Sequence, residues 1–291
     1  MPEQLPTTGQ LENAQRIALV EARYSQDHSA PCVNLIEHFM LRPGEKSLVV
    51  PKVGRMTAAD LVAGVDMVAS EDIGMTTVEL TAAEVGMKVI LDDGLVLQAN
   101  DDVIRMVGRQ MGNGYGVKID TDIIALFVAL NGGTTLGADN INMTARNVGA
   151  CISFAKSNRM PFPLFIVHHP NAVFALTNSL APVGATGSVA IPQGPSADLL
   201  RDFWKVSLSS VPVYEDGNIA KIGSTDSGYG VIASKGAMAM LESQSWRVEP
   251  QRDASLRATE LNGVGRYGVF EIDDTYGAPM RYEILDPSTS N

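Results

Sequence analysis

Two periodicities of apolar residues divide the chain into predicted helices and strands. Helical spacing runs through residues 103–130, where apolar side chains recur every three or four positions and predict a long helix. Glycines within residues 112–116 interrupt this pattern, so we expect one helix kinked there or two helices in series. Two shorter helices are predicted, one beginning at residue 142 or 144 and ending near 156, the other spanning residues 171–180.

Strand signals follow a period of two. Residues 85–91 alternate strictly between apolar and other side chains, and residues 164–167 form a continuous apolar run typical of a buried strand. After residue 206 the chain becomes rich in short apolar segments separated by turns, which predicts an antiparallel sheet. The strands predicted in this part are 211–214, 229–233, 237–241, 246–252, 258–272 and 280–285.

The N-terminal part of the chain has little core of its own. Residues 1–30 are polar, with one marginal helical stretch, whereas residues 31–45 carry apolar side chains at helical spacing and predict a compact helix. Residues 45–85 are extended, rich in turns and short of apolar partners. A segment of this kind needs a neighbour to fold against, and that neighbour can be another copy of the chain.

Charge is unevenly distributed around this extended stretch. Residues 42–55 carry four bases and a single acid, Glu45, whereas residues 60–102 carry ten acids and a single base, Lys88. Charge complementarity between such strips can set the register of neighbouring copies. The alternative is a solvated loop with ordinary surface charge.

Composition narrows the class of protein. The 291 residues are 45% hydrophobic and 19% charged, which is enough for a sizeable core and too apolar for general disorder. A net charge of −11 argues against a protein that grips nucleic acid through its phosphates. The longest strongly apolar run, residues 123–130, is far shorter than the roughly 20 residues of a membrane span. We expect a soluble protein without a signal peptide, made in a reducing cytoplasm.

Glycines and histidines offer weak chemical signals. Gly112, Gly114 and Gly116 lie inside a helical pattern and lack the strand–turn–helix context of a nucleotide-binding loop. The glycine-rich stretch 182–195 has no Lys-Ser or Lys-Thr pair, so it is not a phosphate-binding loop. His168 and His169 are adjacent on a predicted strand and point to opposite faces, which disfavours binding of one metal.

Acids and cysteines add no catalytic arrangement. The acid pairs 92–93 and 101–102 suit a turn and the start of a helix. Cys32 and Cys151 have neither the spacing of a zinc motif nor a disulfide framework, and Cys151 suits a buried thiol. We therefore predict no catalytic, cofactor-binding or metal-ligating residue and no cofactor, although a site assembled from distant residues has no signature in sequence.

The order of segments resembles that of one protein family. Residues 92–130 resemble its passage from a strand into a spine helix, and residues 165–170 resemble its hydrophobic strand that ends in His-Pro. Residues 211–214 resemble the strand that follows its apical helices. Residues 246–253, with 268–272 beyond them, resemble its closing strands, although Pro-Gln stands before Arg-Asp where an acid is common.

On these motifs, from residue 30 to about 290, the chain resembles the major capsid protein of tailed bacteriophages, with the Hong Kong 97 fold. The resemblance implies an α+β fold with an N-terminal arm (1–44) and an extended E-loop (45–90). It further implies a peripheral domain (91–139 and 236–291), which holds the spine helix and a β-sheet, and an axial domain (140–235).

The resemblance also implies a function that is not enzymatic. Such a protein self-assembles into hexamers and pentamers of an icosahedral phage head that encloses double-stranded DNA. The implied partners are other copies of the chain, a separate scaffolding protein, a portal and a decoration protein, with DNA only in non-specific proximity and no membrane. The implied location is the virion, after assembly in the bacterial host cytoplasm. Lys46 and Lys52 are candidate crosslinking lysines of the loop, but no Asn partner is identifiable and we predict no crosslinking.

Two alternatives remain open. The first is an encapsulin, a bacterial nanocompartment shell of the same fold that holds a cargo enzyme. The second is a soluble α/β enzyme with a dispersed site, which would form a small oligomer and show a ligand-dependent melting shift.

Overall fold

The structure is a computed structural model. It describes residues 30–54, 74–94, 101–180 and 206–289, with six single residues between 55 and 73. The predicted helical stretch in residues 1–30 and the glycine-rich stretch 182–195 lie outside the described residues. No helix in the described part of the chain is long and apolar enough to cross a membrane.

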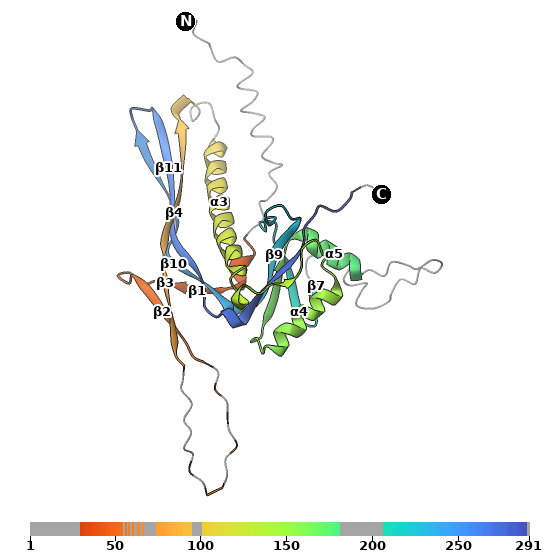
Figure 1. The fold of residues 1–291 in the computed structure, drawn as a ribbon. Helices are drawn as coiled ribbons and strands as arrows, with labels where there is room; N and C mark the ends of the chain where they lie inside the picture. The colour runs from red at the N-terminus through yellow and green to blue at the C-terminus, as the bar shows by residue number, and fades with distance from the viewer. Residues whose placement is uncertain are drawn as a thin grey trace.

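Three α-helices and twelve strands make up the described fold (Figure 1). The helices are α3 (Asp101–Phe127), α4 (Ala145–Ser157) and α5 (Pro170–Leu180). The short 3-10 turns are η2 (Cys32–Leu35), η3 (Asn131–Gly133), η4 (Lys235–Ala237) and η5 (Asp274–Tyr276). The strands are β1 (Glu37–Met40), β2 (Ser47–Lys52), β3 (Thr76–Thr81), β4 (Ala83–Asp92), β5 (Leu136–Gly137), β6 (Leu164–His168), β7 (Val206–Leu208), β8 (Val211–Glu215), β9 (Ser227–Ser234), β10 (Met238–Asp253), β11 (Ala258–Glu271) and β12 (Gly277–Glu283).

A four-stranded sheet in the order β1-β10-β11-β4 runs beside α3 (Figure 1). Its long strand β11 runs antiparallel to both of its neighbours, β10 and β4, whereas β1 pairs in parallel with β10. Tyr115 of α3 stacks on Trp246 of β10 with ring centroids 4.4 Å apart. Gly263 of β11 makes room for this pair, because a Cβ there would lie 2.2 Å from the indole ring. Small residues on the strand thus let two aromatic rings fill the space between helix and sheet.

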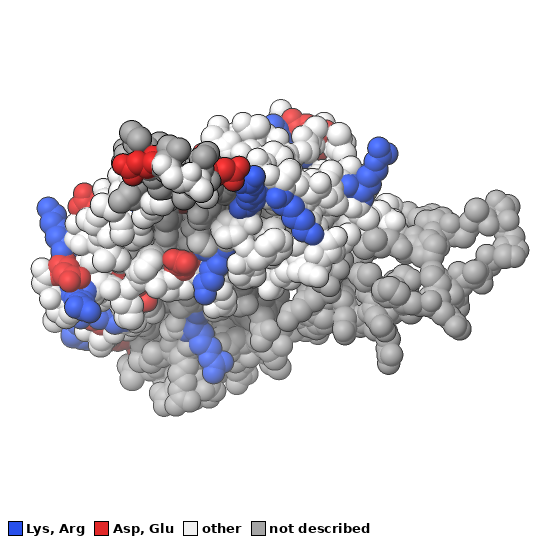
Figure 2. All heavy atoms as spheres, turned by 90° about the horizontal axis from the view of Figure 1, so that it is seen from below, with Lys and Arg blue, Asp and Glu red and all other residues white. Residues whose placement is uncertain are grey.

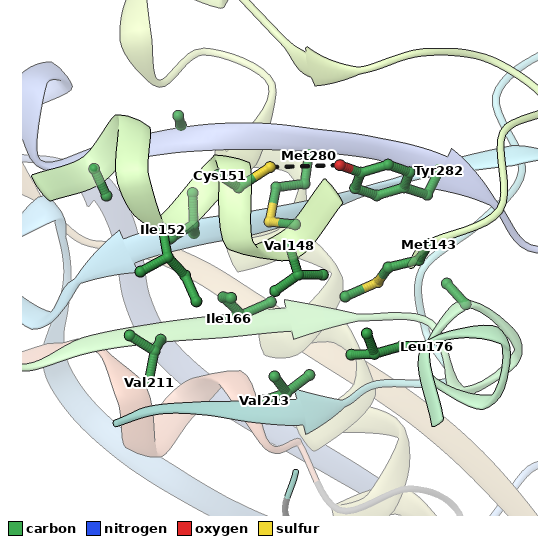
Figure 3. Close-up of a cluster of buried hydrophobic side chains, with 14 of the residues drawn as sticks. Met143, Val148, Cys151, Ile152, Ile166, Leu176, Val211, Val213, Met280 and Tyr282 are labelled. Atoms are coloured by element: carbon green, nitrogen blue, oxygen red, sulfur yellow. Dashed lines mark hydrogen bonds between the residues drawn. The ribbon is translucent and has the colours of Figure 1, made fainter. Parts of the chain in front are cut away.

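A six-stranded sheet in the order β5-β12-β9-β6-β8-β7 forms the second body of the molecule. Alternate residues of its central strand β6 face two different cores, which explains why all five are buried. Ile166 faces α4 and α5, as Figure 3 shows, whereas Phe165 and Val167 face the cluster that includes the end of α3. A strand covered on both faces needs the continuous apolar run seen in the sequence.

The third sheet is the two-stranded hairpin of β2 and β3 (Figure 1). Its strands pair from Ser47 with Thr81 to Lys52 with Thr76. The hairpin extends away from the larger sheets (Figure 1). A hairpin of this size, with so little of its own to pack against, is marginal in water.

The compact helix predicted for residues 31–45 is wrong. The structure has the single 3-10 turn η2 followed by the strand β1, whose residues pair with Ala239–Glu242. Leu41 continues this pairing by donating its backbone N–H to the Glu242 carbonyl over 2.9 Å. Apolar spacing within this segment fits a helix, but hydrogen bonds to the edge of a distant strand override so weak a local preference.

Residues 103–130 predict one helix kinked at the glycines or two helices in series, and the structure has one helix, α3, which ends at Phe127 and stays helical through the glycines. At Gly114 a Cβ would lie 3.1 Å from the terminal methyl of Met87 on β4. This glycine therefore allows close approach of helix and sheet.

The two strands predicted at 237–241 and 246–252 are one strand, β10, with irregular register between Glu242 and Arg247. The predicted C-terminal strands also divide between two sheets, because β12 pairs with β9.

The predictions for residues 142–180 are confirmed. The Thr144 side chain caps α4 by accepting a hydrogen bond from the backbone N–H of Asn147. β6 is the predicted buried strand, and α5 follows it with Pro170 as its first residue, where a missing N–H costs nothing.

Candidate assembly surfaces

The β2–β3 hairpin has one side turned toward its own subunit and one side turned outward. Because side chains alternate along a strand, Leu48, Val50, Val78 and Leu80 share a side, and Leu80 is fully buried. Val49 lies on the other side, where it is paired with Glu79, and both are exposed. The hairpin thus carries an apolar residue on a surface that its own subunit does not cover.

An ion pair fixes the loop end of the hairpin to the rest of the subunit. Lys52 Nζ lies 2.7 Å from Asp273 Oδ1, and only 6% of the Asp273 side chain is exposed. Asp273 also accepts hydrogen bonds from the backbone N–H and the hydroxyl of Thr275. Burial raises the pKa of Asp273, but the hydrogen bonds from Lys52 and Thr275 outweigh burial and hold this pKa below its usual value. Asp273 is therefore an ionised anchor for the hairpin.

Large apolar side chains are exposed on and around the hairpin. Val49, Val53, Met56 and Met75 are each more than half exposed, and Met40 at the end of β1 is 72% exposed. Single exposed apolar residues are common on proteins, but a series of them along one projecting element marks a surface for a partner. Methionine suits such a surface because its flexible side chain adapts to varied neighbours.

Part of the charge pattern seen in the sequence is used within the subunit. Besides Lys52, Lys88 pairs with Glu260 at 2.6 Å and Arg266 pairs with Glu84 at 2.7 Å. Figure 2 shows the molecule from below. On the described surface of this face, Lys and Arg side chains lie singly or in small groups, without one continuous basic patch. Lys46 and Glu79 form no ion pair among the described residues, so their charges are available at the hairpin.

The residues considered for chemistry occupy structural positions. His168 is fully buried at the end of β6, its Nδ1 accepts a hydrogen bond from the His169 backbone N–H, and burial lowers its pKa to about 3. Cys151 is a buried thiol, as predicted, and its sulfur lies 3.4 Å from the Tyr282 hydroxyl (Figure 3). Cys151 and Tyr282 line an open pocket of about 270 Å³ whose other walls are mostly apolar. Asp92 accepts from the Gly94 backbone N–H, which fits the predicted turn.

Sequence reasoning missed one group of polar residues. Cys32, Asp120 and Asp216 are all buried and lie together in the structure. Cys32 hydrogen-bonds with residues 88 and 184 positions away, so no local motif could reveal the group.

No protein-family model and no curated protein sequence matches the chain. Its structure, however, is similar to solved shell proteins over most of both chains. The capsid of cyanophage Pam1 matches with a TM-score of 0.66 at 13% identity, over 89% of this chain and 93% of that one. The SrpI encapsulin of Synechococcus elongatus matches with a TM-score of 0.63 at 12% identity, over 94% and 98%. Mycobacterium phage Che8 matches at 0.59 and 17% identity, over 81% and 84%.

These similarities show the class of fold. The chain has the Hong Kong 97 capsid fold, an α+β fold in which α3 corresponds to the predicted spine helix. At 12% to 17% identity, likeness to solved structures establishes the fold, and the particular function is a matter for proposal.

Proposed function

We propose that the protein is a major capsid protein that self-assembles into hexamers and pentamers of an icosahedral phage head enclosing double-stranded DNA. The observation that carries this proposal is the match of nearly the whole chain to phage capsid structures. The exposed apolar side chains of the hairpin add independent support, because they give each copy a surface that a neighbour can bury.

The division of the chain that we propose is the one that the resemblance implies. Residues 1–44 are the N-terminal arm, 45–90 the E-loop, 91–139 with 236–291 the peripheral domain, and 140–235 the axial domain. Two pairings refine these bounds: β4 joins β11, which favours ending the loop near residue 82, and β12 joins β9, which favours counting β12 with the axial domain.

Assembly would rest on many weak contacts. Each hairpin contributes a small apolar surface, and the sum over many subunits gives a stable shell although each contact alone is weak. Lys46 and Glu79 are charges that a neighbouring copy can pair with, which would favour one register of docking. The net charge of −11 suits a wall around packaged DNA, because a basic lining would hold phosphates. A separate scaffolding protein, a portal and a decoration protein are the further partners that we propose, with the virion as the location.

A second candidate function has a specific observation in its favour. The SrpI encapsulin matches 94% of this chain and is covered to 98% of its own length. A nanocompartment shell is therefore the alternative, and it differs in what the shell contains rather than in the fold.

Electron microscopy of the purified full chain, with light scattering on the same sample, tests both proposals. Closed shells or rings of five or six subunits would support a shell function. Nucleic-acid content with head-sized particles would then favour the phage head, whereas a co-purifying enzyme would favour the encapsulin. A uniform monomer or dimer, unchanged by a candidate scaffolding protein, would overturn both.

A further inference from the structure

Three buried polar side chains join three distant parts of the chain. Cys32 lies on η2, Asp120 on α3, and Asp216 directly after β8. The Cys32 sulfur and one oxygen from each carboxyl group lie within 4.8 Å of one another. Each of the three side chains is almost wholly removed from solvent, with an exposed fraction of 1% or less.

Hydrogen bonds connect these residues directly. Asp120 accepts from the Cys32 backbone N–H over 3.1 Å and from the Asn218 side-chain amide over 2.9 Å. Asp216 accepts from the Cys32 thiol over 3.1 Å and from the Asn218 backbone N–H over 2.9 Å. Oxygens of the two carboxyl groups lie within 4.8 Å of each other. Two carboxylates this close and this buried repel each other, which favours a proton on one of them.

The surroundings favour keeping that proton. Burial, followed by the neighbouring Asp216 carboxyl group, raises the pKa of Asp120 to about 7, while bonds from Asn218 and Cys32 oppose the rise. From β6, the His168 carbonyl accepts a hydrogen bond from the Asp216 backbone N–H. The His168 ring is neutral because burial lowers its pKa to about 3. No lysine or arginine of the described residues is among the groups that shift Asp120.

We propose that Cys32, Asp120 and Asp216 form a proton-dependent clasp, which holds η2 against α3 while the two carboxyl groups share a proton and loosens when that proton leaves. Because Cys32 donates from both its backbone and its side chain, it is the residue that the clasp releases. η2 connects residues 1–29 to β1, so the clasp fixes where the N-terminal residues leave the folded body. The inference concerns the subunit alone and does not depend on the proposed shell function.

The direction of the pH effect follows from proton linkage. In the opened state Asp120 has the ordinary pKa of an Asp, about 3.9. Between that value and about 7, the closed clasp binds a proton that the opened state does not bind. The equilibrium constant for closing the clasp is therefore largest below pH ~4. It falls about tenfold for each pH unit up to about 7 and changes little above that.

Alkylation of the two cysteines in the full chain tests this proposal. The rate of maleimide labelling at pH 5 to 8 is measured for each cysteine by peptide mass spectrometry. Protection is defined as the labelling rate of the denatured chain divided by that of the folded chain at the same pH. We expect protection of Cys32 to fall about tenfold per pH unit between pH 5 and 7 and then to level off. Cys151 is the internal reference, because it is also buried but bonds to Tyr282 and not to a carboxyl group. Its protection should stay constant across that range.

The variant Asp120→Asn sharpens the test. Its amide can donate to Asp216 as the protonated carboxyl group does, and its oxygen can still accept from Cys32. We expect Cys32 protection in this variant to be independent of pH. Glu249→Gln, which removes the same charge from an exposed side chain, should retain the slope of the unmodified chain. A flat profile in the unmodified chain, a parallel fall for Cys151, or a persistent slope in Asp120→Asn would each overturn the clasp. If Asp120→Asn does not fold, the pH profiles of Cys32 and Cys151 protection in the unmodified chain decide whether the clasp exists.

Discussion

The six-stranded sheet and the β2–β3 hairpin bury apolar surface in opposite ways. The sheet has α4 and α5 on one face and the end of α3 on the other, and every residue of β6 is buried. The hairpin buries Leu80 and leaves Val49 exposed, and Met75, next to its loop end, is 65% exposed. One region buries its apolar side chains within the subunit, whereas the other leaves apolar side chains on the surface.

This difference separates folding from assembly. Apolar burial in the sheet contributes to the free energy of unfolding of a single chain. The outward apolar side chains of the hairpin, unlike the buried Leu80, contribute only if a partner covers them, so under the proposed function they act on assembly rather than on the subunit fold. An element of this kind can be changed without unfolding the protein, and that property can be tested directly.

Removal of the hairpin should have the largest effect. Ser47 pairs with Thr81, so the chain on either side of residues 48–82 lies close together and a short glycine link can replace them. We expect the six-stranded sheet to keep its cooperative thermal transition and shells to be absent in electron micrographs. The reason is that the deleted residues carry the outward apolar surface while the sheet contacts its own helices.

The matched control keeps the hairpin and changes only its surface. Val49→Thr combined with Met75→Gln leaves the backbone pairing in place, so it should lower the yield of shells without abolishing the subunit fold. Shells of normal yield from the deletion variant would show that the hairpin is not the assembly element.

Two methionines allow the same truncation in the six-stranded sheet and at the hairpin. Met143 is fully buried in the cluster of the six-stranded sheet, whereas Met75 is largely exposed. Met143→Ala should lower the free energy of unfolding by about 2–5 kcal/mol, because it leaves a cavity. Met75→Ala should change it by less than about 0.5 kcal/mol and should lower shell yield instead. Urea unfolding and light scattering read the two effects, and equal losses of stability would contradict the division between the regions.

The sequence predicted elements whose signals are local. The period of two in residues 85–91, the apolar run of β6 and the Thr144 cap each depend on neighbouring residues, and each is present in the structure. The long α3 was also predictable, because its apolar spacing persists over many turns. The exposed hairpin follows from a lack of apolar partners within its own segment.

Features that depend on distant partners were not predictable. Residues 37–40 have helical spacing, yet they form β1 because the edge of β10 offers them hydrogen bonds. The role of Gly114 is visible only once Met87 is seen against it. The clasp residues Cys32, Asp120 and Asp216 are separated by whole domains of sequence, so their shared proton has no sequence signature.

A smaller loss of stability than that of Met143→Ala is expected at the contact between the hairpin and the segment that leads into the six-stranded sheet. Lys52 belongs to the hairpin, and Asp273 precedes the turn that leads into β12 of the six-stranded sheet. Lys52→Met keeps the length of the side chain but leaves the buried Asp273 carboxylate without its cation. We expect a loss of about 1–3 kcal/mol in the free energy of unfolding, measured by urea denaturation at neutral pH.

The pH dependence of this loss distinguishes the ion pair from simple packing. Because the pKa of Asp273 is lowered in the folded state, its contribution is present above the ordinary Asp pKa and is lost as pH falls through the folded value. The difference between Lys52→Met and the unmodified chain should therefore be full near neutrality and shrink below pH ~4. Lys221→Met is the matched control, because its ion pair with Asp226 has both side chains 47% exposed and is screened by solvent, so its loss should change the free energy of unfolding much less. Equal losses for the two variants at neutral pH would mean that Asp273 does not anchor the hairpin, and the hairpin would then be held to the subunit mainly by Leu80.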